Sequence, residues 1–207
     1  EYEKLIQGEG LGFHVNGFTH QHLYTAIKQN ELVATRFQWG LIPHWVKDKD
    51  TAMKIWNQTL NARGETIFEK PSFRDAAKSK RCLIFVDGFF EHHHKDKNVY
   101  PFFIERIDKA PIVFGGLWSE WVDKTTGEIY QTTTIVTTTG NELMSKIHNN
   151  PKADGARMPL ILESDQFDIW LESKNQLEIQ NTIRPLEDGK LKAHSVRKLK
   201  GKEADLF

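Results

Sequence analysis

The sequence has little cysteine, no excess charge of either sign and no long apolar run. Cys82 is the only cysteine among 207 residues, which excludes an internal disulfide framework and favours a reducing compartment. No apolar stretch is long enough to cross a bilayer, and no secretory signal stands at the front of the sequence. We therefore expect a cytoplasmic, monomeric protein without a membrane partner.

The charges balance, with 28 Lys and Arg residues against 28 Asp and Glu residues. Any nucleic-acid partner must therefore be held by a local basic patch, because the net charge gives no general attraction. The chain is 39% hydrophobic and contains 6 Trp and 13 Phe, so it can bury a substantial core. We predict one domain over residues 1–207, with a C-terminal segment "KAHSVRKLKGKEADLF" that frays.

Most of the chain has the pattern of antiparallel β-strands. Three hairpins are expected, and in each of them two apolar strands flank a polar turn. The turns are Lys28 to Glu31 within "HLYTAIKQNELVATRFQWG", Lys95 to Asn98 between "RCLIFVDGFFEHH" and "VYPFFIER", and "DKTTGE" between "PIVFGGLWSEWV" and "YQTTTIVTTT".

Short helices are expected between these strands and after them. We predict one at Thr51 to Thr59 and one around Arg74 to Lys78. Another follows an Asn141 cap in "GNELMSKI", and a fourth, in "ESDQFDIWLES", follows Ser164 or Asp165 as its cap. The sequence therefore predicts an α+β fold, a single mixed domain with a mainly antiparallel core.

The stretch "RCLIFVDGFFEHHHK" combines an apolar run with Glu91 and three histidines. A metal site, an acid–base site and a solvated strand end are all open to such a pattern. On a strand, His92 and His94 share one face while Glu91 and His93 share the other. Two imidazoles would make half a zinc site, but no matching C-x-x-C or H-x-x-x-H occurs elsewhere, so we predict no metal site.

Other candidate residues are inconclusive when each is taken alone. Cys82 lies inside an apolar run and is expected to be a buried, unreactive thiol. Asn61 and Arg63 stand in the polar stretch "TLNARGET", and His148 lies in "KIHNNPKADGARMPLIL". Trp45, in the proline turn "WGLIPHWVK", is either a core residue or a stacking platform.

Six of these segments occur in a characteristic order: "WGLIPHW", "NARGET", "DGFFEH", "FGGLWSEW", "IVTTTGN" and "IHNNPKADGARMPLIL". The series resembles the SRAP family, the SOS-response-associated peptidases, whose members include proteins that crosslink to abasic sites in DNA. The resemblance covers about Phe37 to Leu162 and extends loosely to "AHSVRK". It implies a barrel-like β core flanked by short helices, no cofactor, and localisation at the nucleoid if the protein is bacterial.

The resemblance also implies a chemistry. Family members expose a cysteine as their mature N-terminus by removing the residue in front of it. The amine of this cysteine condenses with the aldehyde of an abasic site in single-stranded DNA, and its thiol closes a stable thiazolidine. Transferred by motif, Asn61 would hydrogen-bond the linkage, Glu91 would shuttle protons, and His148 would act as general acid and base.

The resemblance also implies which residues contact DNA. Arg63 and Arg157 would bind the phosphates that flank the lesion, and Trp45 would lie near a displaced base. The expected partner is therefore single-stranded DNA, especially DNA that contains an abasic site.

The chain departs from the family pattern in several places. The stretch ahead of "GLGFHVNG" is shorter than usual, and "HVNGFTH" replaces the usual Asn-Val-Pro-type turn before the first hairpin. The chain begins at Glu1 and has no N-terminal cysteine, so either its first residues are missing here or the protein has lost crosslinking. His92 follows the glutamate where relatives often carry an aromatic residue. Where many relatives read His-Asp-Arg-Met-Pro, this chain inserts "NNPKADGA" before "RMP".

Three functions therefore stay open. The first is covalent capture of abasic DNA with self-processing of the N-terminus. The second is a non-covalent single-stranded DNA binding module without the nucleophile. The third is a metal-dependent hydrolase that uses the histidine run.

Overall fold

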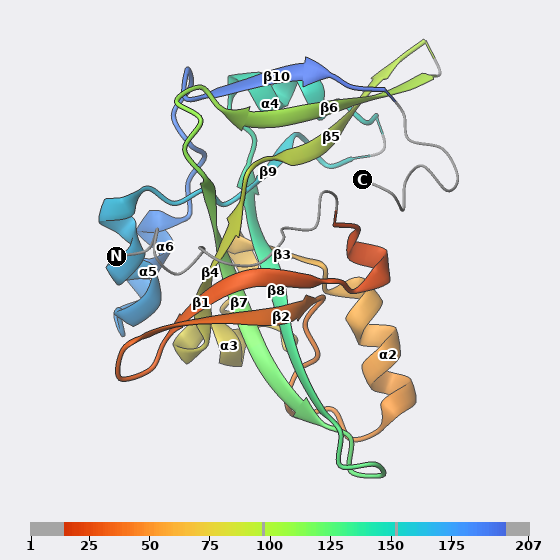
Figure 1. Cartoon of the computed structure of the whole chain (residues 1–207), viewed down its shortest axis with the longest axis vertical. Helices are drawn as coiled ribbons and strands as arrows, with labels where there is room; N and C mark the ends of the chain where they lie inside the picture. Colours follow the sequence, from red (N-terminus) through yellow and green to blue (C-terminus); the bar gives the residue numbers. More distant parts are fainter. Residues whose placement is uncertain (1–14, 97, 152, 198–207) are drawn as a thin grey trace.

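The computed structural model describes residues 15–96, 98–151 and 153–197. In this part of the chain the strands form two sheets, and short helices lie around them (Figure 1). The predicted α+β fold is confirmed. None of the described helices is long and apolar enough to span a membrane.

Five strands of the larger sheet close into a barrel. They follow one another in the order β2, β1, β4, β7 and β8, and β8 pairs again with β2. The neighbours are antiparallel except for the closing pair, in which Gln38 and Trp39 of β2 run parallel to Thr132 and Thr133 of β8. The strands are β1 (His22–Lys28), β2 (Leu32–Trp39), β4 (Arg81–Val86), β7 (Ile112–Val122) and β8 (Ile129–Thr139). The closed circuit confirms the barrel-like core.

Strand β8 joins more partners than any other described strand. Besides β7 and β2 it pairs in parallel with β3 (Asn61–Arg63) and antiparallel with β9 (Arg157–Pro159). Two of its buried threonines bond to nearby backbone: Thr132 Oγ1 accepts from Ile42 N at 3.0 Å and Thr133 Oγ1 donates to Leu117 O at 2.9 Å. These bonds satisfy polar groups that would otherwise be costly inside the barrel.

The smaller sheet is antiparallel, in the order β10 (Leu191–Ser195), β6 (Asn98–Arg106) and β5 (Phe89–Lys95). One prediction fails here. The run "RCLIFVDGFFEHH" is not one strand, because β4 ends at Val86 in the barrel and β5 begins at Phe89 in the other sheet. For the segment expected to fray, residues 192–195 belong to β10 and residues 198–207 lie outside the described part of the chain, so fraying of the C-terminal end stays a prediction.

Gly88 is the physical reason for the break between β4 and β5. A Cβ at this position would lie 2.4 Å from Phe103 Cζ and 2.5 Å from the carbonyl oxygen of Ile104. No side chain fits so close to backbone, and only glycine lets β5 leave the barrel at this point.

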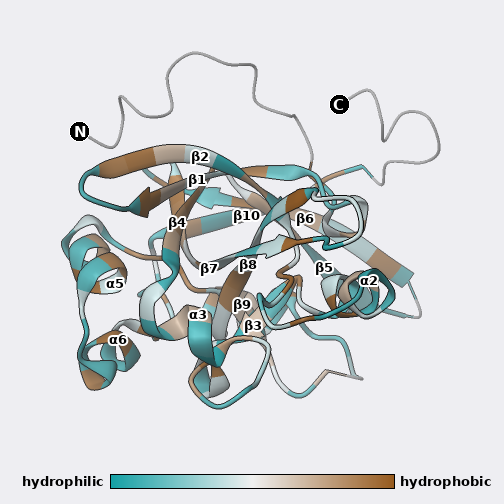
Figure 2. Cartoon of the chain, turned by 90° about the horizontal axis from the view of Figure 1, so that it is seen from below, coloured by the Kyte–Doolittle hydropathy of each residue, from teal (hydrophilic) through white to brown (hydrophobic). Residues whose placement is uncertain are grey.

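The described helices are short and lie outside the barrel (Figure 1). They are α2 (Lys49–Gln58), α3 (Arg74–Ser79), α4 (Glu142–Ile147), α5 (Phe167–Glu172) and α6 (Gln176–Thr182), with 3-10 turns η1 (Gly17–Thr19), η2 (Gly64–Thr66) and η3 (Ser164–Gln166). Figure 2 shows polar and apolar residues mixed on α5 and α6, as expected for helices with one buried face.

Helix caps explain where three of these elements begin. Asn141 caps α4 as predicted, through a bond from Met144 N. Asp48 caps α2 in the same way, so this helix starts two residues before the predicted Thr51. The prediction of Ser164 or Asp165 as a cap is wrong, because Glu163 and Gln166 form a capping box that begins η3 instead.

The core lies on both sides of the barrel wall. Alternate residues of β4 point in opposite directions: Leu83 and Phe85 belong to the cluster that includes Trp170 of α5, and Cys82 and Ile84 to the cluster that includes Met144 of α4. This strand is therefore apolar from Cys82 to Val86, unlike a strand with one solvated face.

Arg81, at the start of β4, is buried yet makes no ion pair among the described residues. Its guanidinium donates to the carbonyl oxygens of Ala77 and Ser173 at 2.6 Å each and to that of Trp170. Burial lowers the pKa of Arg81 to about 10, so the side chain stays charged at neutral pH. A cation at the carboxyl end of α5 complements the helix dipole and ties α3 and α5 to the barrel.

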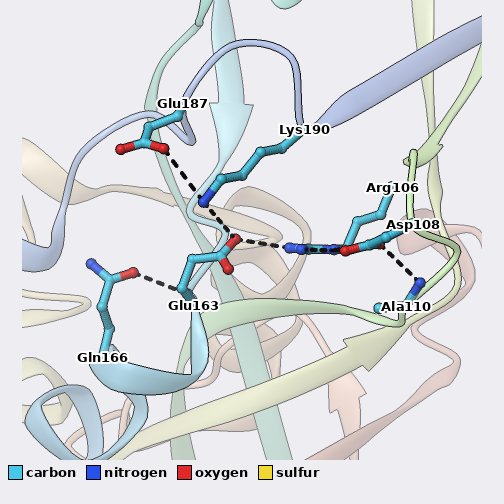
Figure 3. A network of polar contacts seen from close by, with 7 residues as sticks. All are labelled: Arg106, Asp108, Ala110, Glu163, Gln166, Glu187 and Lys190. Carbon is cyan, nitrogen blue, oxygen red and sulfur yellow. Dashed lines mark hydrogen bonds and ion pairs between the residues drawn. The ribbon is translucent and has the colours of Figure 1, made fainter.

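An ion-pair network joins the smaller sheet to the start of η3 (Figure 3). Arg106 of β6 contacts Asp108 and Glu163, each at 2.8 Å. Lys190 lies 3.6 Å from Glu163 and 3.5 Å from Glu187. The hydrogen bond from Arg106, followed by one from the backbone of Ala110, lowers the pKa of Asp108 to about 2.

We predict that Asp108 stabilises the fold in a pH-dependent way. Its folded-state pKa lies below the ordinary 3.8, so its contribution is present at neutral pH and is lost as pH falls from about 4 towards 2. Asp108→Asn should lower the urea midpoint at neutral pH, and the deficit should shrink in that acid window. A deficit that stays constant down to the lowest pH would mean that the carboxylate charge plays no part.

Candidate functional site

Glu91 and His148 form a hydrogen-bonded pair. Glu91 is the third residue of β5, and His148 directly follows the last residue of α4. His148 Nδ1 lies 2.9 Å from Glu91 Oε2, and each side chain is 22% exposed. The other carboxylate oxygen, Oε1, accepts from the backbone N–H of His92 at 2.7 Å. The structure thus brings together two residues that are 57 positions apart in the sequence.

This geometry fixes which nitrogen of His148 can act on a ligand. An ionised carboxylate only accepts hydrogen bonds, so Nδ1 must carry a hydrogen and donate it to Glu91. The opposite nitrogen, Nε2, is then left to give or take a proton. A carboxylate that orients an imidazole in this way is a common arrangement in general acid–base catalysis.

A cavity of about 340 Å³ opens beside the pair. Both members of the pair line it, together with side chains from the β5–β6 hairpin and from the α4–β9 loop (residues 148–156). The lining residues are Glu91, His92, His94, Val99, His148 and Asn150. The acid–base pair is therefore accessible to a ligand, and the histidine run contributes to the wall.

The α4–β9 loop is held against the free edge of β5. Asn149 makes two bonds with the backbone of His94: its Oδ1 accepts from His94 N at 2.7 Å, and its Nδ2 donates to His94 O at 2.9 Å. His93 Nδ1 lies 3.0 Å from Lys146 O at the end of α4. As strand alternation predicts, Glu91 and His93 both face α4.

Asn61 begins β3, where its backbone pairs with Ile135, and its side chain is exposed. The described residues show a hydrogen bond between Glu91 and His148. The expected approach of Asn61 to this pair stays a prediction. The N-terminal cysteine expected as the nucleophile does not occur in the printed sequence, whose only cysteine is Cys82.

The two arginines predicted to bind phosphate are both paired with carboxylates. Arg63 Nη1 lies 3.0 Å from Asp154 Oδ2. Arg157 makes two bonds to Glu65, at 2.7 and 2.8 Å, and also donates to Thr137 O at 2.9 Å. These bonds hold the pKa of Glu65 below its ordinary value.

Trp45 is half-exposed, with 43% of its surface open to solvent. Its Nε1 donates to Pro71 O at 3.2 Å, which fixes the ring orientation and leaves the apolar surface available. This exposure is compatible with stacking on a base.

Several residues around the site could not be predicted from the sequence. The asparagines of "NNP" suggested only a turn, yet Asn149 anchors the loop and Asn150 lines the cavity. Neither Glu65 nor Asp154 stood out as an arginine partner, because each pair joins residues about 90 positions apart. No group of three or more His, Cys, Asp or Glu is arranged to hold a metal among residues 15–96, 98–151 and 153–197.

Comparison with protein families gives one match that spans most of the chain. The model of the family described as SOS response associated peptidase (SRAP) matches residues 9–202. The abasic site processing protein YoqW of Bacillus subtilis is 38% identical over 167 residues, which is 79% of this chain and 69% of YoqW. The chicken abasic site processing protein HMCES is 29% identical over 192 residues and is covered over 55% of its length.

Solved structures have the same fold. A Bacteroides thetaiotaomicron protein superposes with a TM-score of 0.83 at 38% identity, over 89% of this chain and 77% of that protein. A Bordetella bronchiseptica protein superposes with a TM-score of 0.77 at 25% identity, over 86% of this chain and 85% of its own.

The expectation that Cys82 is a buried thiol is confirmed. The residue is fully buried, and burial raises its pKa to about 12. We predict that the folded protein does not react with a chromogenic thiol reagent at about pH 8. After unfolding in denaturant, each protein molecule should react with one molecule of the reagent. Rapid labelling of the folded protein would contradict this burial.

Proposed function

Because the chain belongs to the SOS response associated peptidase family, we propose that it binds single-stranded DNA and acts at abasic sites. The observation that carries the proposal is the hydrogen-bonded Glu91–His148 pair at the wall of an open cavity. The relatives are named abasic site processing proteins, which suggests the abasic site as the lesion. The Glu91–His148 pair offers the acid–base chemistry that a reaction at the aldehyde of an abasic site requires.

The proposed reaction forms and dehydrates a carbinolamine. The ring-opened sugar of an abasic site presents an aldehyde, and an α-amine, whose ordinary pKa is about 8, adds to its carbon. Loss of water needs a proton on the departing hydroxyl, and His148 Nε2 supplies it while Glu91 holds the imidazole in orientation. A thiol on the same residue as the amine then adds to the imine carbon and closes the thiazolidine.

The thiol step needs a cysteine other than the one in the printed sequence. Cys82 is packed inside the barrel, where its sulfur lies 3.4 Å from Thr133 Oγ1 and its thiolate is disfavoured. We therefore assign the covalent step, and the self-processing that exposes the nucleophile, to a form that carries an N-terminal cysteine. The printed chain supplies the DNA-binding surface and the acid–base pair. Without the cysteine, these features correspond to the second candidate function, a non-covalent single-stranded DNA binding module.

DNA binding should rest on local contacts because the net charge is zero. Arg63 is 56% exposed, so it can reach a phosphate without unfolding its surroundings. Trp45 offers a stacking surface, and one stacked base contributes on the order of 1–3 kcal/mol. We assign Arg157 a supporting role, because its guanidinium is already held by Glu65 and Thr137.

We predict that the chain binds single strands more tightly than duplex and that its affinity falls steeply with salt. Fluorescence anisotropy with a labelled oligonucleotide would measure both effects. Trp45→Ala should weaken binding by roughly 1–3 kcal/mol. Arg63→Gln should weaken it and flatten the salt dependence. Salt-insensitive binding, or equal affinity for intact duplex, would contradict a groove for single strands.

We predict that a form with an N-terminal cysteine gives a covalent product with abasic single-stranded DNA that survives denaturing electrophoresis. The printed form, which begins at Glu1, should give none, because an imine without a neighbouring thiol hydrolyses readily. His148→Ala in the cysteine form should slow product formation by on the order of 10² or more, and Glu91→Gln should slow it as well.

Cys82→Ser is the matched control for the thiol. It should leave the covalent product unchanged, because Cys82 is assigned to packing. Loss of the product in this variant, with the fold intact, would overturn the placement of the nucleophile. If the cysteine form binds single strands but gives no product, the non-covalent module becomes the better description.

A further inference from the structure

Asp154 lies on the α4–β9 loop and is paired with Arg63. We propose that Asp154 competes with DNA phosphate for the Arg63 guanidinium, so that the α4–β9 loop lowers and tunes the affinity for nucleic acid. This inference rests on the proposed function, because it takes Arg63 as a phosphate contact. It assigns a regulating role to the α4–β9 loop, which carries Asp154.

The contrast between the two arginine pairs supports the proposal. Arg157 is 17% exposed and binds Glu65 through two nitrogens, with further bonds to Thr137, so its pair holds β8, β9 and η2 together. The other pair is a single contact between side chains that are 56% exposed for Arg63 and 86% exposed for Asp154. Exposed pairs of this kind contribute little to folding stability. The Arg63–Asp154 contact can therefore be exchanged for a ligand without disturbing the fold.

The loop holds Asp154 close to Arg63 from both of its ends. At its start, His148 bonds to Glu91 and Asn149 bonds twice to the backbone of His94. At its end, β9 pairs with β8, and Gly140 N donates to Ala156 O at 2.8 Å. The tip between these anchors is open: a Cβ on Gly155, whose φ is +76°, would meet nothing within 4 Å. The Asp154 carboxylate is therefore exposed at the tip of a short loop that is anchored at both ends.

A carboxylate and a phosphodiester compete for the same feature of arginine. Both present anionic oxygens to the N–H donors of a guanidinium that stays charged at any ordinary pH. Glu65 also lies near enough to Arg63 for the two charges to interact, but its oxygens are occupied by Arg157. Asp154 is therefore the acid that a phosphate must displace. A strand with several phosphates can do this more easily than a single anion, because its other contacts hold it in place during the exchange.

The test is the affinity of the printed chain for a labelled single-stranded oligonucleotide that carries a stable abasic analogue. Asp154→Asn should tighten binding by about two- to fivefold at low salt, the range expected when one exposed ion pair no longer competes. It should also steepen the slope of log affinity against log salt by up to about 0.7, because one more uncompensated positive charge displaces counterions.

Two matched variants separate this competition from a general change in charge. Glu31→Gln removes the same charge from an exposed residue in the β1–β2 turn and should leave affinity unchanged. In an Arg63→Gln background, Asp154→Asn should no longer change the affinity, because the guanidinium for which Asp154 and phosphate compete is absent. Thermal unfolding of each variant confirms that the fold is kept.

The possible results distinguish failure of the Asp154 competition from failure of the proposed DNA binding. If the parent chain binds single strands and Asp154→Asn binds equally well, the competition is wrong while the DNA-binding proposal stands. An equal gain from Glu31→Gln, or a gain that persists without Arg63, would also overturn it. If no variant binds single-stranded DNA at any salt concentration, the proposed function itself fails.

Discussion

At Gly88 the chain leaves the barrel through a space that admits no side chain. A Cβ there would meet Phe103 and the carbonyl of Ile104 at 2.5 Å or less. Because the backbone can pass so close to β6, β5 starts in the second sheet only three residues after β4 ends in the first. Glu91 then lies off the barrel wall, on a strand edge that the end of α4 can reach. The acid–base pair depends on this crossing of the chain between two sheets.

Local patterns were enough to predict much of the fold. The strands of the first and third hairpins, the Asn141 cap and the helix at Arg74 follow from turn residues, capping residues and alternation, which are properties of neighbours in sequence. What these patterns did not predict has non-local causes. The split between β4 and β5 is decided by Phe103 and Ile104, which lie far along the chain, and β10 is ordered because β6 offers it a free edge.

The site shows the same division. The motif series nominated Glu91 and His148, and the structure places them 2.9 Å apart, although their catalytic role stays a prediction. Motifs say nothing of competition between charges, however. Both nominated arginines have carboxylate partners that the sequence did not suggest. The consequences differ, because Arg157 is 17% exposed and binds Glu65 through two nitrogens, while Arg63 is 56% exposed and makes a single contact with Asp154. Burial and geometry decide whether an arginine supports the fold or meets a ligand.

The pairing of β8 bears on the order of assembly during synthesis. This strand binds β2 and β3 from the first third of the chain, β7 just before it, and β9 just after it. On the ribosome the barrel cannot close until Thr132 and Thr133 have emerged to pair with β2. The edges of β2 and β3 that pair with β8 stay unpaired until that strand has been synthesised. The unpaired edge of β2 is thus open to contact with other chains while the nascent chain is still growing.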